Sequence, residues 1–252
     1  MPSDRVTGVE RLLTSAAGGY LSNVVRDAGH TCSICTGPVG GYPTCWRCSQ
    51  TASVDGVADL VVPLTYAVGG SQSAAMLRHY KDDPHPGTRF QHLRIINWLL
   101  YVGIALHRPC IEAVAEQPVT CRLAIPSLRG RSGLHPFVAL ARDMAATDPS
   151  PQLIAAPQAT EDRIINAQQF RLMPSADLTG QHVLILDDTW TTGSRAQSAA
   201  LTLRRAGARW ISVLVVGRWL DPDFAGNAPL LQAMGSRDYE PRRCPVTGGC
   251  CP

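Results

Sequence analysis

The segment at 183–195, Val-Leu-Ile-Leu-Asp-Asp-Thr-Trp-Thr-Thr-Gly-Ser-Arg, constrains the fold more than any other part of the chain. Its first four residues are apolar without interruption, which is typical of a strand buried on both faces. Two adjacent acids follow, then a turn rich in Thr, Gly and Ser, and then an Ala-rich amphipathic stretch at 196–206. This order predicts a buried strand that leads through a tight turn into a helix, the repeating unit of α/β folds.

The rest of the chain alternates between strand-like and helix-like patterns. Pro63 favours an edge position for the first strand, because proline cannot donate a hydrogen bond to a sheet ladder. Short connections between alternating elements predict a mainly parallel sheet with helices on both faces. The expected strands span 57–68, 120–125, 152–156, 181–186 and 210–217, and the expected helices span 9–28 with a break at Gly18-Gly19, 71–80, 88–115 with a kink near Pro109, 135–147 and 193–206.

The turn after the acidic pair has the features of a phosphate site. Its N–H groups, a glycine that permits close backbone approach and the positive end of a helix dipole all favour an anion. The carboxylates of Asp187 and Asp188 suit sugar hydroxyls or a hydrated divalent cation instead. A P-loop is excluded, because no Gly-Lys-Ser/Thr follows the turn. The segment therefore predicts a phosphorylated sugar as ligand, and the competing interpretation is a helix N-cap with solvated acids.

The same segment resembles the phosphoribosyl pyrophosphate (PRPP) motif of type I phosphoribosyltransferases. The resemblance implies that Asp187 and Asp188 are catalytic and hold the ribose. It implies that the ribose 5′-phosphate binds to the turn, at Thr189, Thr191, Thr192, Gly193 and Ser194. Two residues depart from the motif: Trp190 replaces a smaller apolar residue, and Arg195 replaces a hydroxyl residue. Arg195 either adds positive charge to the phosphate site or caps the surface.

A second loop, at 124–133, follows another expected strand and contains Ser127, Arg129 and Arg131. Arginine binds phosphate groups bidentately, so this loop is a candidate pyrophosphate site if it converges with the motif. The alternative is a solvated surface turn, and the sequence allows both.

Four cysteines, Cys32, Cys35, Cys45 and Cys48, form two Cys-x-x-Cys pairs on either side of a Gly/Pro-rich turn. Two such pairs provide four thiolates for a tetrahedral zinc ion, which predicts a closed, structural site. The alternatives are two chance pairs or redox-active dithiols. Zinc ribbons often contact nucleic acid or protein, so a DNA or protein partner is also considered.

The other five cysteines indicate less. Cys110 and Cys121 lie in apolar contexts and are expected to be buried small hydrophobes. Cys244, Cys250 and Cys251 lie in a Pro/Gly-rich tail that we expect to be poorly ordered, although three thiols with one further ligand would suffice for a metal. The predicted division is a helix and zinc segment at 1–52, an α/β domain at 53–236 and the Cys-rich tail at 237–252.

Composition excludes some classes of protein. No apolar run approaches the length of a membrane span, and the N-terminal residues do not resemble a signal peptide, so a cytoplasmic protein with no membrane partner is expected. The net charge of +3 gives no argument for nucleic acid binding.

The order of the zinc knuckles, the segment 77–81 (Leu-Arg-His-Tyr-Lys) and the PRPP motif is similar to that of the ComF family, amidophosphoribosyltransferase-like proteins linked in several bacteria to DNA uptake. The resemblance places Lys81 near the active site, whereas the residue pattern alone favours an exposed lysine. The chain departs from the family at 131–136, where Arg-Ser-Gly-Leu-His-Pro replaces Arg-Gly-Phe-Asn-Gln, so contacts to the second substrate are expected to differ.

The resemblance implies PRPP and Mg²⁺ as ligands and transfer of phosphoribose to a small nitrogenous acceptor, with release of pyrophosphate. The alternative is a non-catalytic PRPP-binding module whose zinc ribbon contacts DNA or protein. The acceptor is not identifiable, and a hood over the site is expected to use 168–177 or the N-terminal third.

Overall fold

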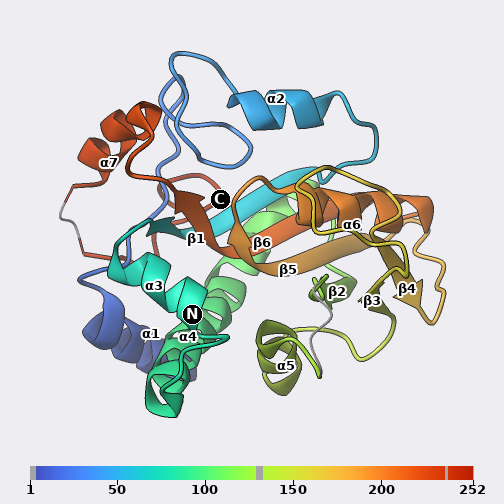
Figure 1. Cartoon of the computed structure of the whole chain (residues 1–252), viewed down its shortest axis with the longest axis horizontal. Helices are drawn as coiled ribbons and strands as arrows, with labels where there is room; N and C mark the ends of the chain where they lie inside the picture. Colours follow the sequence, from blue (N-terminus) through green and yellow to red (C-terminus); the bar gives the residue numbers. More distant parts are fainter. Residues whose placement is uncertain (1–3, 129–132, 236–237, 252) are drawn as a thin grey trace.

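Four parallel strands form the central sheet in the order β1 (Leu60–Val68), β6 (Trp210–Leu220), β5 (His182–Trp190) and β2 (Cys121–Ala124) (Figure 1). The computed structural model describes residues 4–128, 133–235 and 238–251. Each pairing between neighbouring strands is parallel, which confirms the predicted type of sheet. β5 and β6 occupy the centre, as their uninterrupted apolar runs require.

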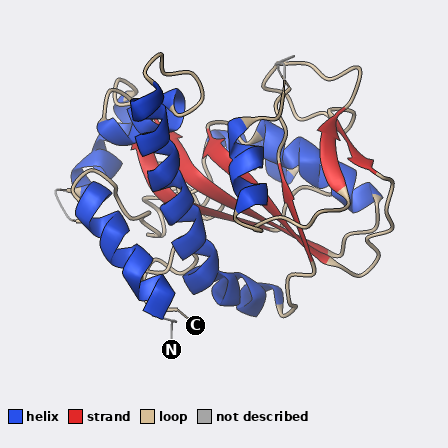
Figure 2. Cartoon of the chain, turned by 90° about the horizontal axis from the view of Figure 1, so that it is seen from below, coloured by secondary structure: helices blue, strands red, loops and turns tan. Residues whose placement is uncertain are grey.

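Helices cover both faces of this sheet, as predicted (Figure 2). One face packs against α1 (Asp4–Ala17), α3 (Gln72–His79), α4 (Pro86–Ala115) and α5 (Pro136–Asp143). The other face packs against α6 (Ser194–Arg205) and the Cys-rich segment that contains α2 (Trp46–Ala52). A short 3₁₀ helix (Ala225–Asn227) and α7 (Ala228–Met234) follow β6.

Side chains of β5 alternate between the two cores. Leu184 and Leu186 belong to the core beneath α1 and α4, whereas Val183 and Ile185 belong to the core beneath α6. All four are fully buried. Each such side chain contributes about 1.5–3 kcal/mol to folding, so this short run holds both layers to the sheet.

Pro63 lies in β1 at the edge of the sheet, as predicted. The free side of this strand is partly covered by the chain after α1. The Ser22 amide donates a hydrogen bond to Thr65 Oγ1 over 3.1 Å, and the Tyr66 amide donates to the Ser22 carbonyl over 3.4 Å. These contacts cover an edge that would otherwise present unpaired backbone groups.

A separate antiparallel pair, β3 (Gln152–Ala155) and β4 (Phe170–Met173), stands beside α6. Thr202 of α6 donates to the Phe170 carbonyl over 3.3 Å. β4 was not predicted, since four residues are too few to establish an alternating pattern. It falls within 168–177, the stretch considered for a hood.

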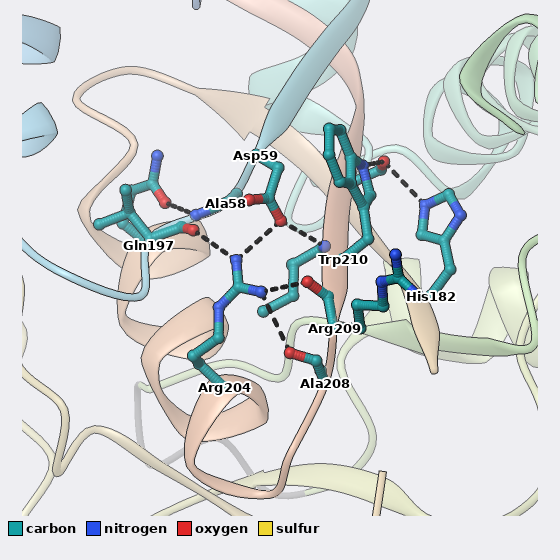
Figure 3. A network of polar contacts seen from close by, with 11 residues as sticks. Ala58, Asp59, His182, Gln197, Arg204, Ala208, Arg209 and Trp210 are labelled. Carbon is teal, nitrogen blue, oxygen red and sulfur yellow. Dashed lines mark hydrogen bonds and ion pairs between the residues drawn. The ribbon is translucent and has the colours of Figure 1, made fainter. Parts of the chain in front are cut away.

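A polar network fastens α6 to the amino ends of the strands (Figure 3). Arg204 Nη2 and the Ile211 amide both lie 2.7 Å from Asp59 Oδ2. Gln197 Oε1 accepts from the Ala58 amide over 2.8 Å, and His182 Nε2 lies 2.9 Å from Ser212 Oγ. The amino ends of β1, β5 and β6 are thereby held together, so that edge of the sheet is structural.

One expectation about a helix is corrected. The first helix ends at Ala17 instead of continuing to 28, because Gly18 starts a turn and the following residues run along β1. The helix α4 extends from Pro86 to Ala115 with Pro109 inside it, close to the expected 88–115.

The C-terminal tail also differs from expectation. Residues 238–251 are described, and Tyr239, Cys244 and Val246 are buried in the same core as α1 and α4. Asn23 makes two hydrogen bonds of 2.8 Å with the backbone of Glu240. The tail packs because its few apolar residues join this core, which local composition does not reveal.

Within the described ranges, no helix combines the length and the apolar character that crossing a bilayer demands.

Candidate functional site

A pocket of about 610 Å³ opens at the carboxyl edge of the sheet, where α/β folds bind ligands. It brings the motif together with Lys81, two residues after α3, and Ser127, from the loop after β2. The two loops therefore converge, as the pyrophosphate interpretation requires. Arg129 and Arg131 lie outside the described residues. The predicted residues that line the pocket are Lys81, Ser127, Asp187, Asp188, Thr189, Thr191, Thr192, Gly193 and Ser194.

The acidic pair lies within β5 and not after it, which corrects the expected strand end at Leu186. β5 continues to Trp190, and Asp187 stands opposite Val215 in the β6 register. Successive side chains of a strand point to opposite faces, so the two carboxylates leave β5 on different sides. They are therefore not equivalent.

Asp188 is held by the residues after α3. Its Oδ2 lies 2.5 Å from the Tyr80 hydroxyl, which donates to it, and 2.5 Å from Lys81 Nζ. Burial raises the pKa of Asp188, but the charge of Lys81 and the hydrogen bonds from Lys81 and Tyr80 outweigh burial and lower it. Asp188 is thus an ionised, positioned carboxylate.

Asp187 is in the opposite electrostatic state. Burial and the neighbouring Asp188 charge raise the pKa of Asp187 to about 8. The charge of Lys81, and the hydrogen bond that the Asp188 amide donates to Asp187 Oδ1 over 2.9 Å, lower the pKa only in part. Asp187 therefore retains a proton near neutral pH and would release it to a cation that entered the pocket.

The turn after β5 has a backbone that only glycine fits at residue 193. Gly193 has φ +80°, and a Cβ there would stand 2.1 Å from the ring of Trp190. Trp190 is buried beneath the turn, so the larger residue at this motif position supports the loop from below. Ser194 begins α6, and the Thr192 hydroxyl lies 3.2 Å from the Ser194 hydroxyl. The N-terminus of a twelve-residue helix thus faces the pocket with hydroxyl donors around it.

Arg218 of β6 fixes the same turn from behind. Its Nη1 donates to the carbonyls of Trp190 and Thr191 over 3.2 and 3.1 Å. Sequence reasoning missed Arg218, because an arginine in an otherwise apolar strand gives no indication of which loop it contacts.

Basic residues surround the acidic pair. Arg195 lines the pocket with an exposed side chain, which favours the phosphate-site interpretation over a surface cap. Arg163 also lines it, from the irregular stretch between β3 and β4, where no periodicity indicated a site. Arg78, whose guanidinium carbon is 5.4 Å from the centre of the Trp219 ring, lies on the α3 side. The pocket therefore combines positive charge for an anion with carboxylates for hydroxyls or a cation.

The lining residues not singled out from the motif or the second loop are Leu77, Arg78, His79, Asp82, His135, Glu161, Arg163, Ala196 and Trp219.

The four predicted zinc ligands form one cluster on the α6 side of the sheet. The sulfur atoms of Cys32, Cys35, Cys45 and Cys48 lie within 4.8 Å of one another. Cys35 Sγ and Cys45 Sγ are 3.7 Å apart, close to the edge of about 3.8 Å that a tetrahedron with 2.3 Å zinc–sulfur bonds requires. The donor set fits zinc, and four protein ligands leave no open coordination position for catalysis.

No protein-family model matches the chain, and the search of curated proteins finds no match.

Proposed function

We propose that the protein is a type I phosphoribosyltransferase of the ComF kind, which binds PRPP with Mg²⁺ and transfers phosphoribose to a small nitrogenous acceptor. One observation carries this proposal: the acidic pair, the hydroxyl-rich turn, Lys81 and Ser127 line a single pocket at the carboxyl edge of a parallel sheet. A sugar that bears phosphates at both ends needs an anion site on each side of a hydroxyl-binding centre. The pocket offers this arrangement.

The turn supports the 5′-phosphate end. The amides at the start of α6 and the hydroxyls of Thr191, Thr192 and Ser194 surround a site suited to an anion. Ser127, Lys81 and Arg163, from three other elements, support the pyrophosphate end.

The carboxylates support the ribose and the cation. Oxygen ligands suit Mg²⁺. Of the two acids, Asp188 forms the described ion pair with Lys81, whereas the described hydrogen bond to Asp187 comes from the Asp188 amide. Asp187 is therefore the better candidate for a cation ligand. When bound, Mg²⁺ would neutralise pyrophosphate charge as the C1–O bond breaks. Asp187 and Asp188 would stabilise the positive charge that develops on the ribose ring, and Lys81 keeps Asp188 ionised for that role.

The bond changes in this reaction are simple. The electron pair of the C1–O bond leaves with pyrophosphate, the acceptor nitrogen forms the new bond to C1, and the nitrogen then loses its proton. The exposed Glu161 lines the same pocket, from the loop between β3 and β4.

The competing function is a non-catalytic PRPP-binding module that contacts DNA or protein through its zinc segment. The exposed aromatic residues of that segment favour it. Tyr42 is 71% exposed and Trp46 is 66% exposed, with the Arg47 guanidinium 4.8 Å from the Trp46 ring. Aromatic and arginine side chains together suit nucleic acid bases or a protein surface.

Pyrophosphate release separates the two functions. Purified protein is incubated with PRPP, Mg²⁺ and a panel of nucleobases and amines. We expect release that depends on one added acceptor, is lost in Asp187→Asn and is retained in Asp55→Asn, which changes an exposed acid outside the pocket. PRPP binding without turnover, together with a DNA gel shift that zinc chelation abolishes, would favour the binding module. Absence of both PRPP binding and turnover would refute the proposal.

A further inference from the structure

The tail brings two cysteines against a histidine and a cysteine of α4. His107, Cys110, Cys244 and Cys251 each offer one ligand atom, and these four atoms lie within 4.8 Å of one another. His107 and Cys110 are three residues apart and therefore share one face of the helix. The first three residues are buried and Cys251 is exposed. Such a group of three thiols and one imidazole is a typical structural zinc donor set.

The separation of the ligand atoms fits a bound metal. Cys251 Sγ lies 3.7 Å from His107 Nδ1. Zinc bonds of about 2.3 Å to sulfur and 2.1 Å to nitrogen give a tetrahedral edge of about 3.6 Å. The four cysteines of this region form no disulfide in the described chain: Cys110, Cys244, Cys251 and the neighbouring Cys250.

The tautomer of His107 is also suited to a metal. Its Nε2 lies 2.8 Å from the Pro241 carbonyl oxygen. A carbonyl only accepts hydrogen bonds, so Nε2 carries the proton and the lone pair of Nδ1 points toward Cys251. Donation from the second ring nitrogen to a carbonyl is the usual outer-shell support of a metal-binding histidine.

The backbone around Cys244 repeats the turn of the first zinc knuckle. The Cys32 amide donates to the carbonyl five residues ahead, Gly37, over 2.7 Å, and the Cys244 amide donates to Gly249 over 2.9 Å. The residue four ahead returns a hydrogen bond to the cysteine carbonyl, from Thr36 over 2.9 Å and from Gly248 over 2.8 Å. That residue has positive φ in both turns, 56° and 82°. Two segments unrelated in position thus place a cysteine in the same turn.

We propose that His107, Cys110, Cys244 and Cys251 hold a second structural zinc ion, which fastens the C-terminal tail to α4. The site is closed by four protein ligands and lies outside the residues that line the pocket, so it supplies folding energy and not catalysis. It would secure the adjoining contacts of the tail, among them the paired Arg242–Glu10 hydrogen bonds of 2.9 and 2.7 Å. This proposal does not depend on the proposed reaction.

Metal analysis of the full-length protein tests the site. With the two clusters filled, elemental analysis is expected to give two zinc ions per chain, and X-ray absorption is expected to give seven sulfur ligands to one nitrogen over both ions. Cys251→Ser should reduce the content to one zinc. Cys250→Ser, which changes the adjacent thiol outside the cluster, should leave two.

Several results would overturn the proposal. One zinc per chain with all-sulfur ligation would do so, and so would an unchanged zinc content in Cys251→Ser. A disulfide between Cys244 and Cys251, found by mass spectrometry in protein purified without reductant, would also contradict it. The ligation measurement uses the unaltered chain, so it decides the question even where a variant does not fold.

Discussion

Gly37 of the first zinc knuckle lies against Arg218 of β6, so closely that a Cβ at residue 37 would stand 2.6 Å from Arg218 Nη2. The same guanidinium donates to the carbonyls of Trp190 and Thr191 at the pocket turn. One side chain therefore lies between the zinc segment and the candidate phosphate site.

Gly37→Ala is expected to weaken PRPP binding. Gly37 does not have positive φ, so the backbone accepts alanine, but the Arg218 guanidinium must shift, which we expect to weaken its hydrogen bonds to the turn. Loss of hydrogen bonds from a charged donor costs roughly 1.5–3 kcal/mol, which corresponds to a roughly tenfold to hundredfold higher Kd. Titration calorimetry with PRPP and Mg²⁺ measures the change. Gly40→Ala is the matched control, because no atom lies within 4 Å of its added Cβ. Equal affinities for the two variants would contradict this coupling.

Replacing the two acids should have opposite effects on stability. Asp187→Asn removes a carboxyl whose charged form is disfavoured by burial and by Asp188, so Tm is expected to rise at pH 8–9. Asp188→Asn leaves Lys81 without its carboxylate and should cost roughly 1–3 kcal/mol, less than a fully buried pair because Lys81 is partly exposed. Thermal unfolding without ligand checks both signs. Two variants that shift Tm in the same direction would be inconsistent with the unequal roles of these acids.

The stability contributed by Asp187 should depend on pH in a defined window. Its folded pKa, about 8, lies above the unfolded value, so the folded state holds the extra proton between about pH 4 and pH 8. That contribution is complete below the unfolded pKa and is lost as pH rises through about 8. Denaturant unfolding of the ligand-free protein from pH 5 to 9 should show a decline that Asp187→Asn removes. An identical pH profile for the variant would argue against the raised pKa.

Binding of the cation should follow the opposite trend. Because Mg²⁺ displaces the Asp187 proton, the affinity for PRPP with Mg²⁺ should rise by up to about tenfold per pH unit below pH 8 and level off above it. PRPP titrates as well, so the comparison that matters is between the unaltered protein and Asp187→Asn. Calorimetry in buffers of different ionisation enthalpy counts the released proton. Equal proton release by the two proteins would exclude Asp187 as its source.

Gly193→Ala should damage the turn severely. The substitution imposes positive φ on alanine and drives its Cβ into Trp190, with an expected cost of at least roughly 2 kcal/mol and loss of detectable PRPP binding. Trp190→Leu in the same chain relieves the contact but not the backbone strain. The cost of Gly193→Ala should therefore be smaller in the Trp190→Leu background than in the unaltered chain, measured by thermal unfolding. An equal cost in both backgrounds would show that backbone strain alone accounts for the loss.

The second zinc site illustrates a limit of local patterns. The sequence predicted Cys110 to be a buried small hydrophobe, and it predicted Cys244 and Cys251 to lie in a poorly ordered tail. No ligand spacing connects residues 110 and 244 in the sequence. His107 carried no signal at all. Proximity between α4 and the tail arises from tertiary packing, in which Tyr239 and Val246 join the shared core.

The sequence by itself determined the features that depend on near neighbours. Uninterrupted apolar runs specified the central strands, the pairs of cysteines specified the first four-cysteine cluster, and the order of acids, hydroxyls and glycine specified a turn at the start of a helix. Only the tertiary structure decided which residues share a site. It paired Lys81 with Asp188, separated the electrostatic states of the two acids and placed Arg218 between the zinc knuckle and the pocket. These relationships depend on how distant segments pack across a sheet, and side-chain periodicity contains no information about such distances.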